Sequence, residues 1–299
     1  MRTRRFLTCF WLVCLTSGCF HTVRFDLKSS HEAPAEGVNK VIVETRNGRA
    51  NLVCRTAPGP VRVQATRKGR GSTEAAAREC AEAMTIQVER DTLDPATLRI
   101  AMVAPPEPKW GWSHGASFDV ELPQGVDVDV QTSSGAVTVR GARGDLKLKT
   151  SNGAIAVADV QGDMDVQTSN ARIELAGVEG GRIHASTSNG SIEAHDISGE
   201  PSLRTSNGRI RLHLDRTPGR PRIRVVSSNG EIELEVPGTV EADLNLRTSN
   251  GSITHDLGGF DAVHGVKSSR DRFQATLNGG GGSIEGETSN GRVSFRSRR

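Results

Sequence analysis

Two pairs of aspartates have the spacing that most suggests acid–base chemistry. Asp127 and Asp129 form one Asp-x-Asp pair, and Asp163 and Asp165 form another. Residues two apart on a strand point to the same side, so each pair could place two carboxylates in one groove, as in enzymes that cleave polysaccharides. A valine or a methionine separates the two aspartates of each pair, which is the pattern of a strand with one wet face. We therefore expect solvated surface groups rather than catalytic ones.

A second constellation has metal-ligand chemistry. His195, His213 and Glu235 each stand eight residues after the first residue of a repeated tetrad, so they would share a column if the repeats stack. Two imidazoles and a carboxylate can hold Zn²⁺, whereas exposed residues that merely share a column would hold nothing. We predict the latter, with no metal and no cofactor. The sequence also lacks a His-Glu metal motif, a phosphate-binding glycine loop and a nucleophile elbow.

The first nineteen residues predict export and lipid attachment. A basic start precedes the apolar run from Phe6 to Leu15, which is too short to cross a membrane and is typical of a signal peptide. The following Thr16-Ser17-Gly18-Cys19 resembles the bacterial lipobox, which implies cleavage before Cys19 and lipidation of that residue. The lipobox usually has Leu, Val or Ile where Thr16 stands, and an ordinary cleaved signal is the alternative. Residues 1–18 are the predicted signal peptide and 19–37 a lipidated tether.

Two cysteines remain after the signal and the lipid site are set aside. Cys54 and Cys80 would lie in an exported, oxidising setting, where an even pair predicts a disulfide. Two buried free thiols are the alternative. The sequence has only 4% aromatic residues, which disfavours stacking platforms for sugars or single-stranded nucleic acid. Removing the signal removes three arginines and leaves equal numbers of basic and acidic residues, so we predict no nucleic-acid partner.

The elements that must position these residues come from an internal repeat. The tetrad Thr-Ser-Asn-Gly, or a close variant, begins at Thr132, Thr150, Thr168, Thr187, Thr205, Ser227, Thr248 and Thr288, and Ser268 begins a degenerate copy. Apolar residues alternate with polar ones before and after each tetrad, which predicts strands with one buried face. Asn-Gly predicts a tight turn with positive φ between them, so Gly208, for example, should need that conformation.

The near-constant repeat length favours a solenoid over an antiparallel meander, because like positions then stack on like. We predict an all-β fold, a single-stranded parallel β-helix-like solenoid of about nine coils of 18–22 residues spanning residues 126–299. One inward row should hold Ile155, Ile173, Ile192, Ile210 and Ile232. One turn ladder should hold Asn152, Asn170, Asn189, Asn207, Asn229, Asn250 and Asn290. On the outer face, Glu193, Arg211 and Glu233 should be neighbours of alternating sign.

Residues 38–125 predict a small N-terminal β/α region that caps the first coil. Asn47-Gly48 echoes the repeat, and residues 73–84 are rich in alanine and predict one helix, with Thr73 as its N-cap. The Pro- and Trp-bearing stretch 105–112 predicts a loop. An open coil end is an unpaired strand edge, which is why a cap is needed.

The lipobox, the small mixed head, the strand ending Leu122-Pro123-Gln124-Gly125 and the Val-x-Val-x-Thr-Ser-x-Gly repeats together resemble the bacterial putative-adhesin family over residues 38–296. The resemblance implies repeated β-strands, a cell-envelope location and no catalytic residues. Ala171 departs from the pattern because it replaces the turn glycine.

We expect a non-enzymatic lipoprotein of the envelope, anchored by its lipid in the outer membrane, that acts as an adhesin-like binding or structural module. Its partner would be an envelope protein or a surface ligand. A polysaccharide-active β-helix enzyme and a component that senses envelope stress are the alternatives.

Overall fold

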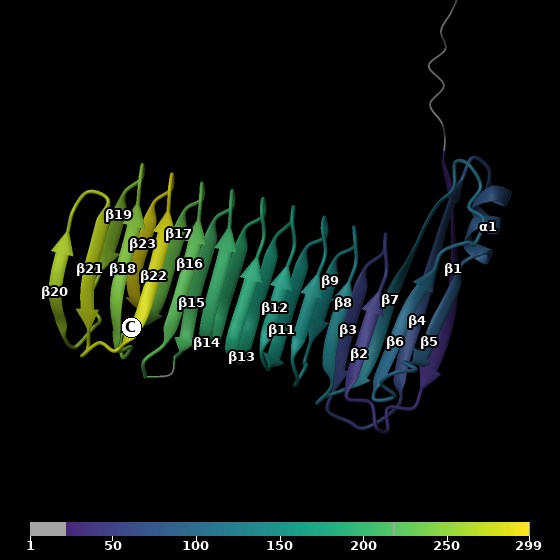
Figure 1. The fold of residues 1–299 in the computed structure, drawn as a ribbon, viewed down its shortest axis with the longest axis horizontal. Coiled ribbons are helices and arrows are strands. Elements are labelled where there is room, and N and C mark those ends of the chain that lie inside the picture. The colour runs from purple at the N-terminus through teal and green to yellow at the C-terminus, as the bar shows by residue number, and fades with distance from the viewer. Residues whose placement is uncertain (1–21, 218, 299) are drawn as a thin grey trace, which may run out of the picture.

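The fold is an elongated stack of strands with a single short helix at one end (Figure 1). It comes from a computed structural model that describes residues 22–217 and 219–298. Each repeat supplies one strand that leads into the tetrad and one that follows it, and the tetrads form the turns along one long edge. We call the two resulting sets of strands the leading row and the trailing row. Within the described ranges, no helix is long and apolar enough to cross a membrane.

The leading row contains, in spatial order, β5 (Thr85–Arg90), β6 (Thr97–Val103), β2 (Lys40–Glu44), β8 (Asp127–Gln131), β10 (Leu146–Lys149), β12 (Met164–Gln167), the second halves of β13 (Ile173–Ser186) and β14 (Ile192–Thr205), β16 (Arg222–Ser227), β22 (Gly282–Thr288), β18 (Ala242–Thr248), β21 (Arg272–Leu277) and β20 (Val263–Ser268). β5, β20 and β21 pair antiparallel with their neighbours, and the other neighbours in this row are parallel.

The trailing row contains β1 (Val23–Ala33), β4 (Val61–Gly71), β7 (Ser113–Pro123), β3 (Ala50–Arg55), β9 (Val137–Arg140), β11 (Ile155–Gln161), the first halves of β13 and β14, β15 (Ile210–Arg216), β17 (Ile232–Pro237), β23 (Val293–Arg298) and β19 (Ile253–Asp256). Only the pairs β1–β4 and β4–β7 are antiparallel here, so β4 alone runs against the other strands of the row. Parallel pairing of successive repeats excludes the meander.

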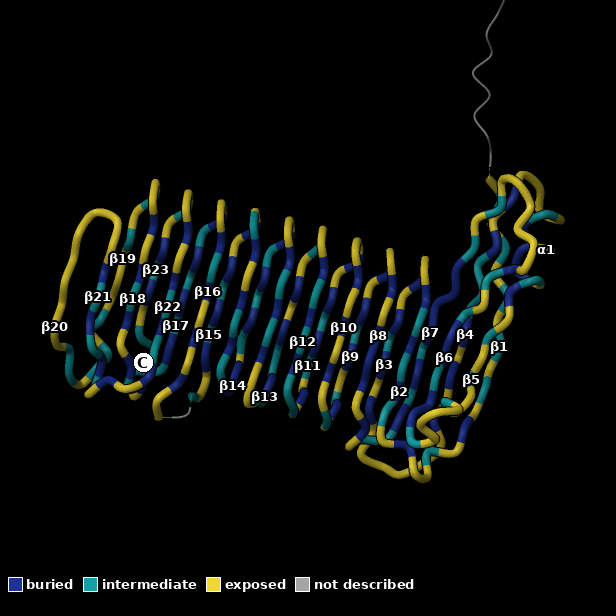
Figure 2. Tube along the Cα trace, in the orientation of Figure 1, coloured by how far each residue is buried: buried dark blue, intermediate teal, exposed yellow. Residues whose placement is uncertain are grey.

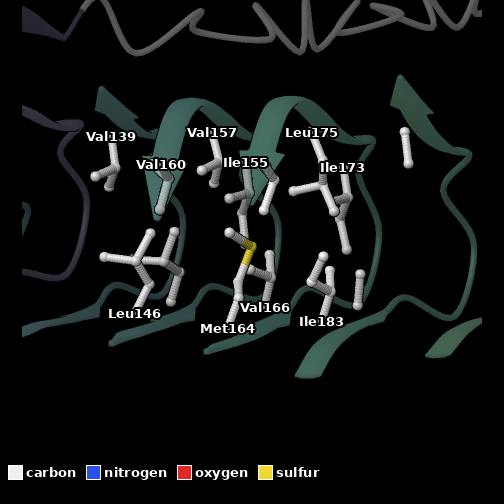
Figure 3. Packing of buried hydrophobic residues seen from close by; sticks show 14 of the residues in the cluster. Val139, Leu146, Ile155, Val157, Val160, Met164, Val166, Ile173, Leu175 and Ile183 are labelled. Atoms are coloured by element: carbon white, nitrogen blue, oxygen red, sulfur yellow. The ribbon is translucent and has the colours of Figure 1, made fainter. Parts of the chain in front are cut away.

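The core lies between the two rows, where the inward residues of both meet (Figures 2 and 3). Ile155, Ile173, Ile192, Ile210 and Ile232 are register partners from strand to strand and are each at most 1% exposed. This is the predicted inward row. Burying one such side chain contributes about 1.5–3 kcal/mol, so the repeated column is a main source of stability along the stack.

The stack does not follow chain order at its far end. β22 lies between β16 and β18, and β23 lies between β17 and β19. The last repeat is therefore inserted one place before its predecessor in sequence. The run from Gly279 to Gly281, with φ of 118°, 73° and 97°, permits the reversal that brings the chain back into the stack.

The degenerate copy at Ser268 is not a coil, and that part of the prediction is wrong. Ser268 ends β20, and residues 269–271 connect it to β21 as an antiparallel hairpin. β21 pairs antiparallel with β18 and so covers the edge of the last parallel strand in the leading row. This copy has Asp271 at its fourth position, where the stacked turns have glycine or, at Ala171, alanine.

The N-terminal head is built differently from its prediction in two respects. Residues 23–33 are not a tether, because β1 pairs with β4 along all eleven of its residues. Alternating side chains from Val23 to Ala33 carry the period-two signal that the polar composition masked. In addition, β2 and β3 belong to the stack itself, between β6/β7 and β8/β9. The predicted helix is present as α1 (Glu74–Glu82), and Thr73 Oγ1 accepts the Ala76 N–H at 3.1 Å.

Candidate functional site

The tetrad turns form one long edge of the stack, which we call the tetrad edge. A column of threonine hydroxyls stabilises this edge, and the sequence did not indicate their role. Each tetrad threonine is buried, and its hydroxyl donates to a backbone carbonyl of the neighbouring turn. In several turns the hydroxyl also accepts the N–H of the glycine in its own tetrad. Thr205 Oγ1 donates to the Gly190 carbonyl at 2.9 Å and accepts the Gly208 N–H at 3.2 Å. Thr150 and Ser227 repeat this arrangement in their own turns. The first tetrad residue therefore joins each turn to the neighbouring turn, which explains why a hydroxyl recurs there.

The tetrad glycine is required by close approach and not by positive φ, so the predicted reason was wrong. Gly208 is not among the described residues with positive φ. A Cβ built on it would lie 1.7 Å from the Gly190 carbonyl oxygen, which is far inside contact distance. The turns thus stack backbone on backbone at this position, and a side chain fits only if the turn shifts. At the one departure, Ala171, the Thr187 hydroxyl still donates to the Ala171 carbonyl, at 3.2 Å.

The seven asparagines predicted to form a ladder do so on the exposed rim of this edge. Successive side-chain amides bond at 2.6–2.9 Å from Nδ2 to Oδ1, in the spatial order Asn152, Asn170, Asn189, Asn207, Asn229, Asn290, Asn250. Asn290 comes before Asn250 because the last repeat is inserted into the stack. Each interior amide uses one donor and one acceptor in the ladder. Its second N–H remains available to a ligand or water, except at Asn207, whose Nδ2 also donates to the Ser188 carbonyl at 3.5 Å.

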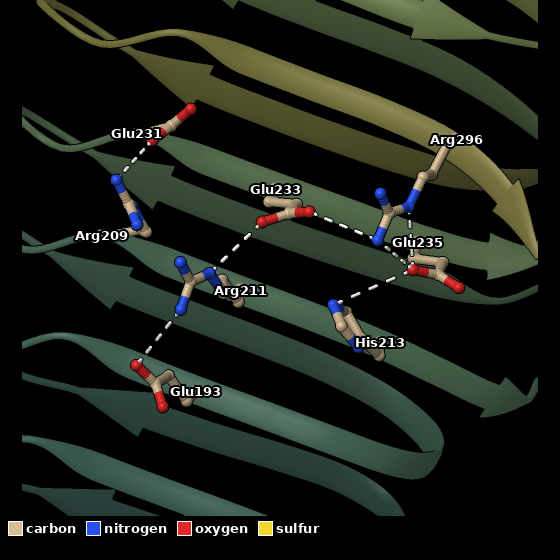
Figure 4. Close-up of polar contacts among 8 residues, drawn as sticks. All are labelled: Glu193, Arg209, Arg211, His213, Glu231, Glu233, Glu235 and Arg296. Atoms are coloured by element: carbon tan, nitrogen blue, oxygen red, sulfur yellow. Dashed lines mark hydrogen bonds and ion pairs between the residues drawn. The ribbon is translucent and has the colours of Figure 1, made fainter.

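The outer face of the trailing row carries a network of opposite charges (Figure 4). Arg211 lies between Glu193 at 3.6 Å and Glu233 at 3.3 Å, as the sequence predicts. Arg296 joins Glu233 to Glu235, with its Nη2 3.4 Å and 2.7 Å from their carboxylate oxygens. Arg209 pairs with Glu231 at 2.8 Å. Exposed pairs contribute little individually, and the alternation of charge is confined to Glu193, Arg211 and Glu233, because their neighbours in the column are Glu174 and Ser294.

The three metal candidates are not assembled as a ligand set. In the pairing of β14 with β15, Ala194 faces Leu212 and Ile197 faces Leu214. Two residues of β14 therefore stand opposite His213 alone, and His195 lies in this bulge. His213 Nε2 is 3.9 Å from Glu235, whose carboxylate is already held by Arg296. Among the residues that the structure describes, no group of three or more His, Cys, Asp or Glu side chains is arranged to hold a metal ion.

The aspartate pairs have structural partners. Asp127 accepts the backbone N–H of Asp145 at 2.9 Å, and Asp145 accepts that of Asp163 at 3.0 Å. Asp163 accepts the Arg182 N–H at 3.0 Å and also pairs with its guanidinium, which together hold the pKa of Asp163 below its ordinary value. The spacing of 18 between these aspartates was the signal for this column. Asp129 is only 7% exposed and lies 3.9 Å from Lys40, while Asp165 accepts from Gln167.

The predicted disulfide does not form, since Cys54 and Cys80 are both buried free cysteines. Cys54 on β3 pairs with Leu122 of β7. Cys80 Sγ lies 3.7 Å from the carbonyl of Ser113, which begins the same strand. Nine residues of extended β7 separate these two points, or about 30 Å, whereas bridged Cα atoms lie within about 7 Å. The even number of cysteines, on which the prediction rested, could not reveal that the two thiols lie at opposite ends of the head.

Both thiols should resist alkylation while the protein is folded. Burial raises the pKa of Cys54 to about 11 and also raises that of Cys80, so the reactive thiolate is scarce at neutral pH. We expect iodoacetamide to modify neither residue in the folded mature chain and both in denaturant without reductant. Mass spectrometry of the two reactions measures this. A mass that shows a Cys54–Cys80 bond, or rapid labelling of the folded chain, would contradict the placement of these residues.

Cys19 lies outside the residues that the structure describes, so its lipidation stays a prediction. The described chain begins at residue 22, and β1 begins at Val23.

Comparison with known proteins gives one family and two structures. A family model described as Toastrack DUF4097 matches residues 44–295. A crystal structure of a putative cell adhesion protein from Clostridium sporogenes aligns with 8% identity and a TM-score of 0.27, over 92% of this chain and 100% of that chain. A crystal structure of a putative adhesin from Bacteroides fragilis aligns with 9% identity and a TM-score of 0.39, over 91% and 97%. No curated protein matches the sequence.

Proposed function

The chain belongs to the toastrack family DUF4097, and on that premise we propose that it is a non-enzymatic, lipid-anchored binding or structural module of the bacterial cell envelope. One observation carries the proposal. The stack displays the same side-chain amide at the strand spacing, about 4.8 Å, along the asparagine edge, next to an outer face on which Arg211 joins two glutamates. A surface with a fixed repeat suits a partner that is itself extended, such as another envelope protein or a surface polymer.

The acidic side chains already bind backbone N–H groups and arginines, which supports a non-enzymatic role. A general acid or base needs a carboxyl that can exchange its proton with substrate. Asp127 and Asp163 instead each accept a backbone N–H from the next coil, and Asp163 is also paired with Arg182. Glu233 and Glu235 are held by arginines. These carboxylates hold neighbouring coils together, which is an adequate reason for their presence.

A photo-crosslinking experiment on intact cells tests the binding role. The crosslinking residue replaces Ser188 on the tetrad edge, Arg211 on the outer trailing face or Arg204 on the outer leading face, in three separate variants. We expect one discrete partner or polymer to be captured from the edge or the trailing face and not from the leading face. Equal capture from all three positions, or none beyond that of the unmodified protein, would argue against a specific binding surface.

The location rests on Cys19. We propose that signal cleavage leaves Cys19 as the lipid-bearing N-terminus and that the protein is held in the outer membrane. Changing Cys19 to alanine should leave the protein unprocessed or release it in soluble form into the periplasm. Fractionation of cells into membrane and soluble protein measures this, with the mass of the N-terminal peptide as a second readout. A Cys19→Ala protein that still partitions with the membrane at its mature mass would place the anchor elsewhere.

A further inference from the structure

One end of the head projects beyond the level of the tetrad turns (Figure 1). Gly48, in the first of these turns, packs against the Ala116 carbonyl of β7. β7 begins three residues earlier, at Ser113, and β4 runs beside it to Gly71. The two strands therefore extend about 10 Å past the turn. β1 begins at this end as well, because Val23 pairs with Gly71.

The projecting end carries an exposed tryptophan. The loop between β6 and β7 places Trp110 at a turn closed by the Trp112 N–H and the Lys109 carbonyl at 3.1 Å, and the Trp110 side chain is 93% exposed. Lys109 forms an ion pair with Glu79 of α1 and lies 5.5 Å from the centre of the Trp112 ring. The ion pair joins the loop to α1 on one side of Trp110, and β7 begins at Ser113 on the other side. The indole is thus presented by a restrained turn.

The start of the folded chain lies close to this tryptophan. β4 is flanked by β1 and β7, so Val23 and Ser113 are two strand spacings apart, or about 10 Å. Three residues separate Cys19 from Val23, and four extended steps reach at most about 14 Å. A lipid on Cys19 would therefore hold the projecting end within that distance of the bilayer.

We propose that Trp110 inserts into the headgroup region of the membrane to which the chain is anchored, so that the projecting end of the head rests on the bilayer. This rests on the lipid anchor proposed above. An indole has an apolar body and one N–H donor, and tryptophan is enriched at membrane interfaces for that reason. The partner is a phospholipid surface, reached from the side on which β1 begins.

The charges around the loop indicate which lipids matter. The basic residues at this end are balanced by acidic ones: Arg24, Arg70, Arg78 and Lys109 stand against Asp26, Glu74, Glu79 and Glu107. A polybasic site would require anionic lipids. The charges at this end cancel, so no anionic headgroup is needed to neutralise them. The contact should therefore form on zwitterionic vesicles. A single tryptophan binds weakly by itself, so the contact depends on the high effective concentration that the tether supplies.

Tryptophan fluorescence tests the contact independently of lipidation, because Trp110 and Trp112 are the only tryptophans after the signal peptide. The chain from residue 20 to 299 receives a His-tag at its N-terminus and is captured on phosphatidylcholine vesicles that contain a nickel-chelating lipid. Trp112→Phe leaves Trp110 as the only fluorophore, and Trp110→Phe leaves the half-buried Trp112. We expect a blue-shifted emission that brominated acyl chains quench in the Trp112→Phe protein and not in the Trp110→Phe protein.

Moving the tag supplies the control. β23, the last strand, lies ten strand spacings from β1 in the trailing row, or about 48 Å. Capture through a C-terminal tag should therefore leave Trp110 emission unchanged. Absence of quenching with the N-terminal tag, or equal quenching with either tag, would overturn the proposal. Neither result would bear on Cys19, whose lipidation is decided by the mass of the N-terminal peptide, so the two proposals fail separately.

Discussion

Replacing Gly208 with valine is expected to destabilise the folded protein by about 2–6 kcal/mol, from overpacking and a lost buried hydrogen bond. The new Cβ would lie 1.7 Å from the Gly190 carbonyl oxygen, so the turn must move outward. That movement breaks the bond from the Gly208 N–H to Thr205 and displaces the carbonyl that accepts the Ser227 hydroxyl. One substitution thus disturbs the contacts with the turns on both sides. Urea denaturation followed by circular dichroism measures the change.

Ala171 provides the matched control, since the chain already carries a side chain at this position of one turn. Gly208→Ala tests the cost of a single methyl group, and we expect it to lie between the wild type and Gly208→Val. Ala171→Gly should be neutral or stabilising, because it removes a methyl group from a position where the turns stack backbone on backbone. If Gly208→Val were as stable as the wild type, the backbone-on-backbone contact would not exist.

Replacing Ile210 with alanine should cost about 2–5 kcal/mol, the range for large-to-small changes in a packed core. Ile210 is 0% exposed and stands between Ile192 and Ile232 in the inward row. Its loss would leave a cavity at the centre of the stack, where strands on both sides fix the backbone and limit collapse. Circular dichroism in urea gives the change in the free energy of unfolding.

The adjacent residue, Arg209, tests which side of the strand faces the core. Arg209 is exposed and pairs with Glu231, so Arg209→Ala should change the free energy of unfolding by at most about 0.5 kcal/mol. A variant with Arg209→Ala as unstable as Ile210→Ala would mean that the wrong face is buried. The register would then be displaced by one residue throughout, because side chains alternate strictly along a strand.

The repeating part of this fold could be predicted because each coil repeats the same local information. Alternation sets the buried face, a constant length sets the stacking, and both identify the isoleucine row and the asparagine ladder. The glycine was identified, but for the wrong reason. Positive φ is a property of a single turn, whereas the contact between Gly208 and the Gly190 carbonyl exists only when two turns are stacked.

The parts that could not be predicted depend on contacts between segments distant in sequence. The polar composition of residues 23–33 suggested a tether, and only the eleven-residue pairing with β4 makes them a strand. The separation of Cys54 from Cys80 depends on the direction and length of β7. The position of β22 and β23 in the stack cannot be predicted from the repeat spacing. Their tetrad has the same residue pattern as the others, so it would fit either before or after the tetrad of β18 and β19.

The insertion of β22 and β23 has a consequence for the order in which the protein matures. A chain that is synthesised from its N-terminus can stack coils as they emerge, up to β16 and β17. β18 and β19 then have no parallel neighbours, because their places beside β16 and β17 belong to strands that are made last. The far end closes only when the final residues arrive. A polypeptide cut short before β22 would keep an open edge, which gives proteases a way to distinguish an unfinished molecule from a complete one.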